Sequence, residues 1–258
     1  MSHHIVEVNN LEFAYPDGTA ALAGVSLRIL HGESVAIVGA NGAGKSTLLS
    51  HLIGLLTPAA GTVRVGDFPL TPETLPRIRQ TVGMVFQNPD DQLFMPTVLD
   101  DVAFGPLNLG LPPEEARQRA LASLETVGAL HLQDRPPYRL SGGQKRAVAI
   151  ASVLSMSPDI LVMDEPSSAL DPWSRRQLIG LLQSFRHTKI IASHDLDLVM
   201  EVCERTIVLS AGRVAADGPT LRIFQDEALL KESRLEKPLR LQACPVCGKG
   251  EATPAASD

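Results

Sequence analysis

The sequence predicts an α/β fold whose sheet is interrupted by a helical segment in the middle of the chain. Two uninterrupted apolar runs, ILVM at 160–163 and KIIAS at 189–193, are typical of strands buried on both faces. A glycine-rich loop at 39–47 separates an apolar strand-like run from a segment with helical spacing. Between about 97 and 157 the pattern is mainly helical.

The first sixty residues alternate between strand-like and turn-like pieces. IVEVNN and LEFAY, within 5–15, predict two short strands, and PDG at 16–18 predicts a turn. VSLRIL and ESVAIVG predict two further strands, separated by His31-Gly32. After the glycine loop, STLLSHLIGLL carries apolar residues at the spacing of one helix face, at positions 48, 49, 52, 53 and 56.

The rest of the chain predicts a helical lobe and then more α/β structure. The stretch at 111–128 has prolines and two glutamates in its first turn and ends at Gly128, which are helix start and stop signals. DLDLVMEVC predicts a helix, and TIVLSAGRVAADG predicts a closing hairpin. We therefore expect one domain over 1–230, with its helical lobe at about 97–157, and a flexible tail over 231–258.

Composition excludes several classes of protein. The 258 residues carry a formal net charge of −6, whereas nucleic-acid binders carry basic stripes. The longest mostly apolar runs, such as 147–156, have about half of the ~20 residues that a membrane span needs. The N-terminus lacks the pattern of a signal peptide, and three cysteines do not make a disulfide framework. We expect a cytoplasmic protein.

The glycine-rich loop has the pattern of a phosphate-binding loop. GANGAGKST at 39–47 fits G-x-x-x-x-G-K-[ST], in which glycines let successive N–H groups point at phosphate oxygens. We expect Lys45 to reach the β- and γ-phosphates and the Ser46 hydroxyl to bind Mg²⁺. A chance glycine loop is the alternative, which the flanking strand and helix disfavour. The loop residues expected to bind nucleotide are Gly39, Asn41, Gly42, Gly44, Lys45, Ser46 and Thr47.

An acidic pair follows the buried run at 160–163. Ligands of α/β sheets bind at the carboxyl ends of the strands, so Asp164 is placed to hold the Mg²⁺, directly or through water. Glu165 lies one residue further and could orient or deprotonate the attacking water. Two solvated surface charges are the alternative.

LSGGQKRAVAIASVL, from 140, predicts a second anion-binding helix N-terminus. Ser141 followed by Gly142 and Gly143 opens a helix whose free N–H groups suit a phosphate. Because the first loop already holds one set of phosphates, this N-terminus must serve another nucleotide or the nucleotide of another subunit. That arrangement requires a dimer. An ordinary serine-capped helix is the alternative.

Five motifs in this order and spacing resemble an ABC-type ATPase over residues 1 to about 220. They are GANGAGKST, LSGGQ at 140–144, ILVMDEP at 160–166, SALD at 168–171 and SHD at 193–195. The resemblance implies an ABC-type nucleotide-binding domain with an antiparallel β subdomain, a RecA-like core and a helical subdomain. It also implies a head-to-tail dimer that sandwiches two ATP molecules between one subunit's phosphate loop and the other's LSGGQ.

The resemblance assigns roles to further residues. Gln87 would contact Mg²⁺ and the attacking water, and His194 would contact the γ-phosphate. Asp171 would lie across the dimer seam, and Gln144 would belong to the LSGGQ contact with the second nucleotide. Tyr15 matches the aromatic residue that stacks on adenine; a strand aromatic packed on the core is the alternative.

A docking segment at 87–106 begins at Gln87. It combines acids (Asp90, Asp91, Asp100, Asp101) with apolar side chains (Leu93, Phe94, Met95, Phe104). This mixture suits a short partner helix that carries arginine or lysine, and a solvated loop is the alternative.

QNPDDQLF and PTVLDDVAFGPLNLGL resemble the ATPase subunits of energy-coupling factor transporters, especially the cobalt and nickel type. That resemblance implies import powered by a homodimer, or by a heterodimer with a related ATPase, at the cytoplasmic face of the membrane. A membrane scaffold would dock on 87–106, and a separate membrane subunit would capture the substrate. A vitamin-type system, another ABC transporter and a soluble ABC ATPase acting on nucleic acid or ribosomes are the alternatives. Acidic charge disfavours the last.

The tail departs from this family. CPVCG at 244–248 provides two of the four ligands that a tetrahedral zinc site needs, and two tails meeting in a dimer could complete it. A flexible tail with two reduced thiols is the interpretation we prefer.

Overall fold

The larger of two sheets organises the computed structural model, which describes residues 6–242. Its strand order is β10-β9-β3-β8-β7-β6, and all neighbours are parallel except β10. Its strands, in that order, are Arg213–Pro219, Arg205–Ser210, Ser34–Val38, Thr188–Ala192, Ile160–Asp164 and Val82–Val85. Every residue of β3, β6, β7 and β8 is buried, as the continuous apolar runs predict.

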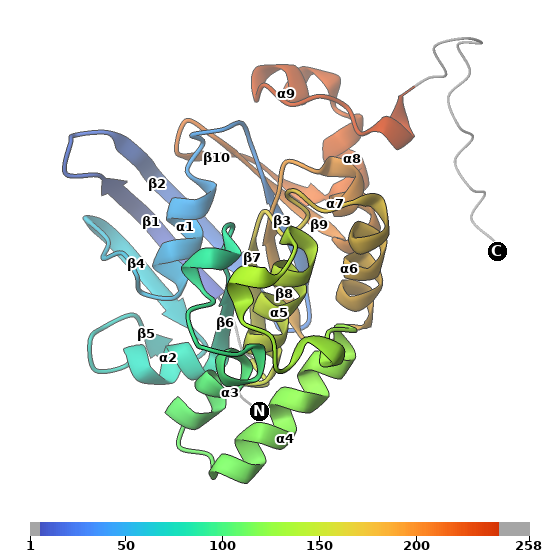
Figure 1. The fold of residues 1–258 in the computed structure, drawn as a ribbon. Helices are drawn as coiled ribbons and strands as arrows, with labels where there is room; N and C mark the ends of the chain where they lie inside the picture. The colour runs from blue at the N-terminus through green and yellow to red at the C-terminus, as the bar shows by residue number, and fades with distance from the viewer. Residues whose placement is uncertain (1–5, 243–258) are drawn as a thin grey trace, which may run out of the picture.

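A smaller antiparallel sheet, of order β2-β1-β4-β5, lies to one side of the first (Figure 1). Its strands are β1 (Val6–Ala14), β2 (Ala20–Ile29), β4 (Ala60–Val65) and β5 (Phe68–Pro69). The two strands expected within 5–15 are one strand, because a register shift near Asn10, at φ 47°, absorbs the break in pattern.

Helix α1 (Lys45–Leu52) lies between the two sheets and ends earlier than its apolar spacing suggests, because Gly54 takes a positive φ of 64°. One hydrophobic core packs α1 between the antiparallel sheet and one face of the larger sheet. The short α2 (Leu75–Thr81) leads into β6.

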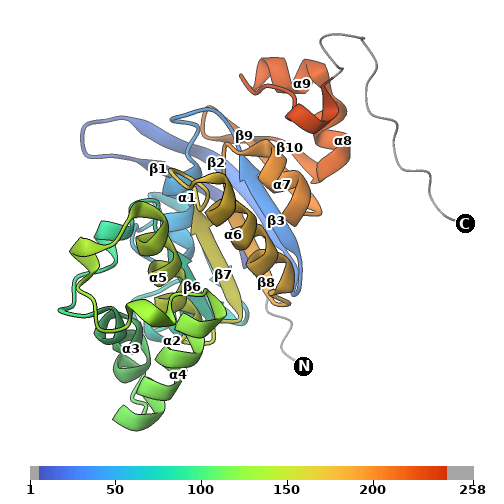
Figure 2. The ribbon, with the colours of Figure 1, turned by 45° about the vertical axis from the view of Figure 1, so that its right-hand side comes forward.

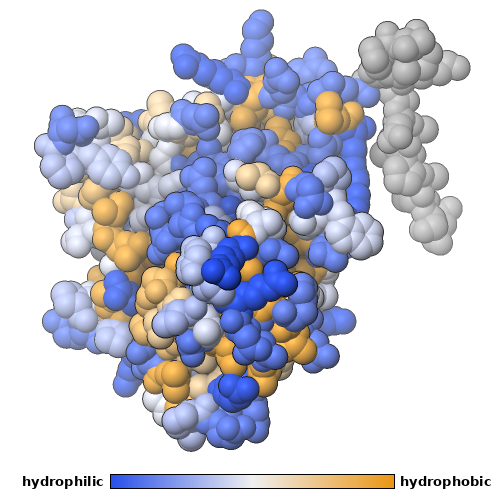
Figure 3. Space-filling model, in the orientation of Figure 1, coloured by the Kyte–Doolittle hydropathy of each residue, from blue (hydrophilic) through white to orange (hydrophobic). Residues whose placement is uncertain are grey.

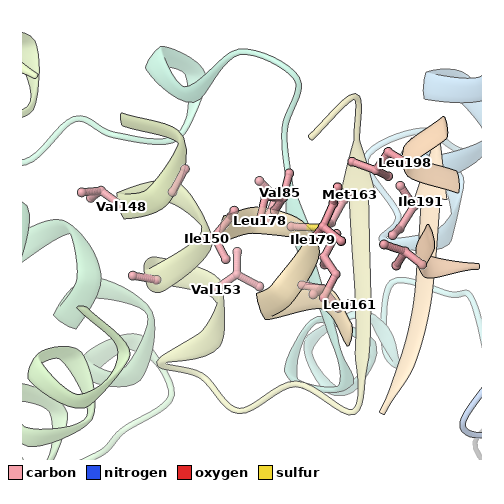
Figure 4. Packing of buried hydrophobic residues seen from close by; sticks show 14 of the residues in the cluster. Val85, Val148, Ile150, Val153, Leu161, Met163, Leu178, Ile179, Ile191 and Leu198 are labelled. Carbon is pink, nitrogen blue, oxygen red and sulfur yellow. The ribbon is translucent and has the colours of Figure 1, made fainter. Parts of the chain in front are cut away.

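A second core covers the other face of the larger sheet. Figure 4 shows Ile150 and Val153 of α5 on one side of this core, Leu178 and Ile179 of α6 at its middle, and sheet residues such as Met163 beyond. The covering helices are α5 (Gly142–Leu154), α6 (Pro172–Ser184) and α7 (Leu196–Val202).

The helical lobe extends away from the sheets (Figure 2), as the pattern at 97–157 predicts. It consists of α3 (Val98–Asn108), α4 (Pro113–Thr126) and α5, with three short 3₁₀ helices before and between them, η1 (Pro89–Asp91), η2 (Leu130–Leu132) and η3 (Pro137–Arg139). The antiparallel sheet, the parallel core and this lobe are the three parts that the resemblance implies.

The last described elements are α8 (Thr220–Gln225), α9 (Glu227–Glu232) and η4 (Leu239–Leu241). Helix α8 packs on α7, and α9 packs on α8. Leu230 is buried, and the N–H groups of Leu239 and Arg240 donate to Asp197 at 3.2 Å each. Within the predicted tail, residues 231–242 therefore lie against the domain; Cys244 and Cys247 lie outside the described residues. No helix of residues 6–242 is long and apolar enough to span a membrane.

Candidate nucleotide site

The glycine loop connects the end of β3 to the start of α1 by close backbone contacts. A Cβ at Gly39 would collide with the carbonyl oxygen of Leu209 on β9. Gly44 has a φ of 103°, and a Cβ there would lie 2.6 Å from the carbonyl oxygen of Ala21 on β2. The loop can therefore pack closely against both sheets only with glycine at positions 39 and 44.

A cavity of about 490 Å³ opens over this loop. Lys45 lies beneath it, only 7% exposed, and its Nζ donates to the carbonyls of Gly39 at 2.8 Å and Ala40 at 3.3 Å. The ammonium is thus held over the loop, where a phosphate would meet it. The predicted site residues that line the cavity are Tyr15, Asn41, Gly42, Gly44, Lys45, Ser46, Thr47, Gln87, Glu165 and His194.

Tyr15 closes one side of the cavity. Its hydroxyl is hydrogen-bonded to the Thr47 hydroxyl at 2.9 Å, and its ring meets Phe13 edge to face with centroids 5.1 Å apart. The ring is 39% exposed. It therefore keeps surface on which a base can stack.

The carboxylate of Asp164 ends β7 under the loop. It is 5% exposed, and its Oδ1 has no hydrogen-bond partner. Burial raises the pKa of Asp164, and a hydrogen bond with the Ser46 hydroxyl opposes the rise. The unpartnered Asp164 oxygen lies beside the Ser46 hydroxyl, and Ser46 and Gln87 both line the cavity, so these three groups fit Mg²⁺. Among residues 6–242, no cluster of three or more His, Cys, Asp or Glu could hold a metal ion.

Glu165 and His194 form a contact across the ends of two neighbouring strands. The Oε2 of Glu165 lies 2.7 Å from His194 Nδ1 and accepts from the His194 N–H at 3.1 Å. Glu165 is 5% exposed and has a φ of 47°, a conformation that non-glycine residues adopt at functional sites. The imidazole itself is mostly exposed. A carboxylate held so firmly beside an open imidazole suits the orientation of a water molecule.

The residues of LSGGQ lie away from this cavity. Ser141 caps α5 as predicted: its hydroxyl accepts from the Gln144 N–H at 3.3 Å, and the Gln144 side chain accepts from the Ser141 N–H at 3.0 Å. A Cβ at Gly142 would meet no atom within 4 Å, so the backbone of this helix N-terminus is open. Ser141, Gly142, Gly143 and Gln144 do not line the cavity over the glycine loop in the same subunit.

Asp171 likewise lies outside the cavity. Its carboxylate caps α6, accepting from the N–H groups of Trp173 and Ser174 at 2.9 and 3.0 Å. A Cβ at Gly143 would lie 3.8 Å from its Oδ2, so Asp171 is next to the start of α5 in the same subunit.

Sequence reasoning missed two arginines around the site. Arg175 on α6 binds both carboxylate oxygens of Asp195, at 2.7 and 2.9 Å, and Asp195 directly follows His194. Arg146 on α5 binds the backbone at Gln87. Neither has a local signal, because each partner lies many residues away along the chain.

The docking segment uses most of its acids internally. Asp90 forms a 2.5 Å ion pair with Lys145 on α5, and Asp100 accepts from the Thr97 hydroxyl at 2.6 Å in the cap of α3. The Oδ1 of Asp101 accepts from the N–H groups of Phe94 and Met95 at 2.9 and 3.0 Å. The prediction of these acids as a freely available negative surface is therefore wrong for Asp101, which braces the loop.

The apolar side chains of the segment divide in two. Leu93 is 7% exposed and belongs to the core, so the prediction of Leu93 as a docking anchor is wrong. Phe94 is 64% exposed and meets Phe104, 39% exposed, edge to face with centroids 5.0 Å apart. Figure 3 shows hydrophobic surface among hydrophilic surface over the part of the molecule that holds the helical lobe.

Replacement of Asp101 tests the brace. Asp101→Ala is expected to lower the free energy of unfolding by about 1–3 kcal/mol, since two N–H groups lose their acceptor. Asp101→Asn keeps an acceptor and is expected to stay within about 1 kcal/mol of wild type. Urea unfolding measures both.

The pH dependence checks the same carboxylate. Burial raises the pKa of Asp101, so its contribution to stability is present at low pH and is lost as pH rises through that raised value. Wild type should therefore gain stability relative to Asp101→Asn as pH falls toward 4. If Asp101→Ala and Asp101→Asn lose the same free energy of unfolding, the proposed role of Asp101 in bracing the loop is contradicted.

Comparison with known proteins finds close relatives. The ABC transporter family model matches residues 22–168. A protein of Geobacter sulfurreducens, named as a candidate ABC transporter ATP-binding protein, is 69% identical over 96% of this chain and 100% of its own length. The energy-coupling factor transporter ATP-binding protein EcfA of Methanothermobacter thermautotrophicus is 47% identical over 91% of this chain and 77% of its own.

Solved structures are similar as well. The cbiO1 protein of Clostridium perfringens, part of the ABC transporter complex cbiONQ, is 39% identical with a TM-score of 0.77, covering 89% of this chain and 94% of that one. A bacterial ABC transporter cassette, solved as a dimer, is 31% identical with a TM-score of 0.76, covering 83% and 98%.

Proposed function

This chain belongs to the ABC transporter family as an ATP-hydrolysing subunit, and we propose that it powers import through an energy-coupling factor transporter. The observation that carries the proposal is that the docking segment starts at Gln87 in the nucleotide cavity and includes the exposed pair Phe94 and Phe104. Similarity to EcfA and to cbiO1 supports the same class of transporter. The amino-acid sequence of the docking segment favours cobalt or nickel as the substrate over a vitamin.

We propose a head-to-tail dimer with two composite sites. One subunit would supply the cavity over the glycine loop, and the other would supply Ser141, Gly142, Gly143 and Gln144, with Asp171 at the seam. Two findings support this: the LSGGQ residues lie away from the cavity in one subunit, and the similar bacterial cassette is a dimer. Either two copies of this chain or a copy with a related ATPase could form it.

The proposed mechanism assigns one task to each group. Lys45, the loop N–H groups and the second subunit's α5 N-terminus stabilise charge on the phosphoryl oxygens. Ser46, Asp164 and Gln87 would hold Mg²⁺, which would supply positive charge to the phosphates of the nucleotide. Glu165 orients and deprotonates the water, and His194 donates to the γ-phosphate. ATP thus favours the closed dimer, and hydrolysis releases it.

The proposed function also implies a location and membrane partners for this chain. We propose that the chain is peripheral to the cytoplasmic face of the membrane, beneath a scaffold subunit that docks on residues 87–106. A separate membrane subunit would capture the substrate. Residues 1–230 would form the ATPase domain, and the tail at 231–258 would begin with residues 231–242, which lie against that domain.

Phe94→Asp is expected to remove docking without changing basal turnover. Phe94 is mostly exposed and contacts no residue of the nucleotide cavity that we describe, so the fold should tolerate the change. The change removes the apolar side chain that would pack against the partner helix, which we expect to weaken scaffold binding about tenfold or more. Leu30→Asp, at an exposed leucine directly after β2, is the matched control. Equal scaffold binding by Phe94→Asp and wild type would contradict this docking surface.

Tagged purification from detergent-solubilised native membranes tests the function. Co-purification of a small polytopic scaffold with a cobalt- or nickel-binding membrane subunit would support the metal proposal. A vitamin-binding subunit or a second related ATPase would move the chain to a vitamin-type system. Recovery of only ribosomes, nucleic acid or soluble proteins would contradict the energy-coupling factor proposal.

A further inference from the structure

His51, near the end of α1, is a fully buried imidazole that the proposed function does not use. Its Nδ1 lies 2.7 Å from the carbonyl oxygen of Thr47, one turn earlier in the same helix, and its Nε2 has no hydrogen-bond partner. Burial lowers the pKa of His51 by more than backbone hydrogen bonding raises it, so the ring is neutral at neutral pH. Because a carbonyl oxygen only accepts, Nδ1 carries the proton and donates to Thr47.

Filling space does not require a histidine at this position. A leucine would occupy the same interior without leaving a buried nitrogen unpartnered, which is unfavourable. What the imidazole adds is a ring in a fixed plane. The hydrogen bond from Nδ1 to the Thr47 carbonyl limits rotation about the Cβ–Cγ bond of His51, so the ring meets its neighbours in one orientation.

The imidazole meets Phe13 of β1, in the sheet against which α1 packs (Figure 1). The two rings lie edge to face, with centroids 4.9 Å apart and an interplanar angle of 74°. Phe13 and Tyr15 also meet edge to face, at 5.1 Å and 86°. Aromatic pairs are most favourable in such arrangements, so turning one ring away from its neighbour loses energy. Three rings in contact thus lead from the buried helix to the nucleotide cavity, which Tyr15 lines.

Thr47 holds the same tyrosine from the other side. The hydroxyl of Thr47 is hydrogen-bonded to the Tyr15 hydroxyl at 2.9 Å, and its carbonyl accepts from His51. Tyr15 is therefore held at its hydroxyl by α1 and at its ring by Phe13, and His51 contacts both of the residues that hold it. The tyrosine itself directly follows β1 and precedes the turn at 16–18, so the strand fixes its backbone on one side only.

We infer that His51 is a positioning residue that fixes the plane of the Tyr15 ring for stacking on the nucleotide base. It acts through Phe13 and does not touch the nucleotide. The inference rests on the proposed stacking of the base on Tyr15. Loss of His51 should weaken the contribution of the base to binding, while the contribution of the phosphates, which Lys45 and the glycine loop would hold, stays unchanged.

Ser50 provides a matched control on the same helix. Its hydroxyl donates to the Ser46 carbonyl at 2.8 Å, which is the same one-turn contact to the backbone that His51 makes to Thr47. The Ser50 bond lies on the exposed side of α1. Ser50→Ala therefore removes a helix hydrogen bond of the same kind and leaves the three rings in place.

The test uses the full chain at low protein concentration, where nucleotide binds to the monomer. A fluorescent ATP analogue is displaced either by ATP or by inorganic tripolyphosphate, which lacks a base. His51→Leu is expected to weaken ATP binding about fivefold, with tripolyphosphate binding within about twofold of wild type. Ser50→Ala is expected to change neither by more than about twofold.

A double substitution separates positioning from general damage to the helix. Tyr15→Leu removes the stacking surface and is expected to weaken ATP binding about tenfold. Added to Tyr15→Leu, His51→Leu should cause no further loss, because the ring that it positions is gone. A substitution that only disturbed α1 would weaken ATP binding in both backgrounds and would weaken tripolyphosphate binding in parallel. Either result overturns the inference, as does an equal loss of ATP binding by Ser50→Ala.

If His51→Leu fails to fold, His51→Asn decides. Its amide can still donate to the Thr47 carbonyl, but it has no ring to meet Phe13. For either variant, a loss of ATP binding of about threefold or more with unchanged tripolyphosphate binding supports the inference, and a smaller loss overturns it.

The Tyr15→Leu variant shows which proposal has failed. If Tyr15→Leu weakens ATP binding and the His51 variants do not, this inference alone is overturned. If Tyr15→Leu binds ATP as wild type does, the stacking on Tyr15 is overturned and the inference with it, and the proposed transporter function remains. Wild-type protein that binds neither ATP nor tripolyphosphate would contradict the proposed function itself.

Discussion

Glu165→Gln is expected to lower ATP turnover by about 10²–10⁴-fold while leaving ATP bound, because the amide cannot accept a proton from the attacking water. The substitution keeps the shape of a side chain that is 5% exposed, and its carbonyl oxygen can still accept from the His194 N–H. The fold and the cavity should therefore remain. With ATP present and hydrolysis blocked, the closed dimer should accumulate.

Phosphate release measures the turnover, and light scattering with and without ATP measures the dimer. Glu204→Gln, at an exposed glutamate, is the matched control and should behave as wild type. Adding Lys45→Met to Glu165→Gln should abolish the ATP-dependent dimer, since the ammonium over the loop is lost. A monomeric Glu165→Gln protein with normal turnover would contradict the role proposed for Glu165.

Gly142→Asp is expected to lower ATP turnover by about 10²-fold or more. Gly142 does not line the cavity over the glycine loop of its own subunit. A Cβ at Gly142 meets no atom within 4 Å, so the fold should accept the side chain. Its carboxylate would repel the phosphates of the second subunit's nucleotide at the α5 N-terminus. ATP affinity of the monomer should stay unchanged, because the cavity over the glycine loop is untouched. Gly142→Ala, which adds a methyl group without charge, is the control.

Mixing two inactive variants tests the head-to-tail arrangement directly. In a dimer of Gly142→Asp with Lys45→Met, one composite site combines an intact glycine loop with an intact LSGGQ. Random pairing should therefore restore up to about a quarter of wild-type turnover, if the sites act independently. No recovery on mixing, with heterodimers shown to form, would mean that each subunit completes its own site.

Much of the candidate site could be predicted from the sequence because its signals are local. The glycine loop, the acid pair after β7 and the serine cap of α5 each depend on neighbouring residues and on the strand or helix that they adjoin. Lys45 and Glu165 were expected from these motifs, and Tyr15, Gln87 and His194 from the resemblance to ABC-type ATPases; all five line one cavity. The parallel core and the helical lobe could also be predicted from the spacing of apolar residues.

The docking segment shows where such prediction ends. Leu93 and Phe94 are adjacent apolar residues, and only the packing of the segment on α5 decides that Leu93 is buried and Phe94 is exposed. The four acids of the segment look alike in sequence, yet their surroundings differ. Asp101 accepts from two N–H groups of the loop, and Asp90 pairs with Lys145 of α5.

The sequence by itself determined the fold class, the glycine-rich loop, the serine cap of α5 and the acidic pair, because each depends on consecutive residues with a fixed period or spacing. Only the tertiary structure decided that Arg146 holds the carbonyl of Gln87, 59 positions away, and that Arg175 holds Asp195. Contacts of this kind depend on how the lobe and the sheet pack, and a buried arginine has no pattern of its own to announce its partner. The parts of the site come from local chemistry, and the connections between them come from packing.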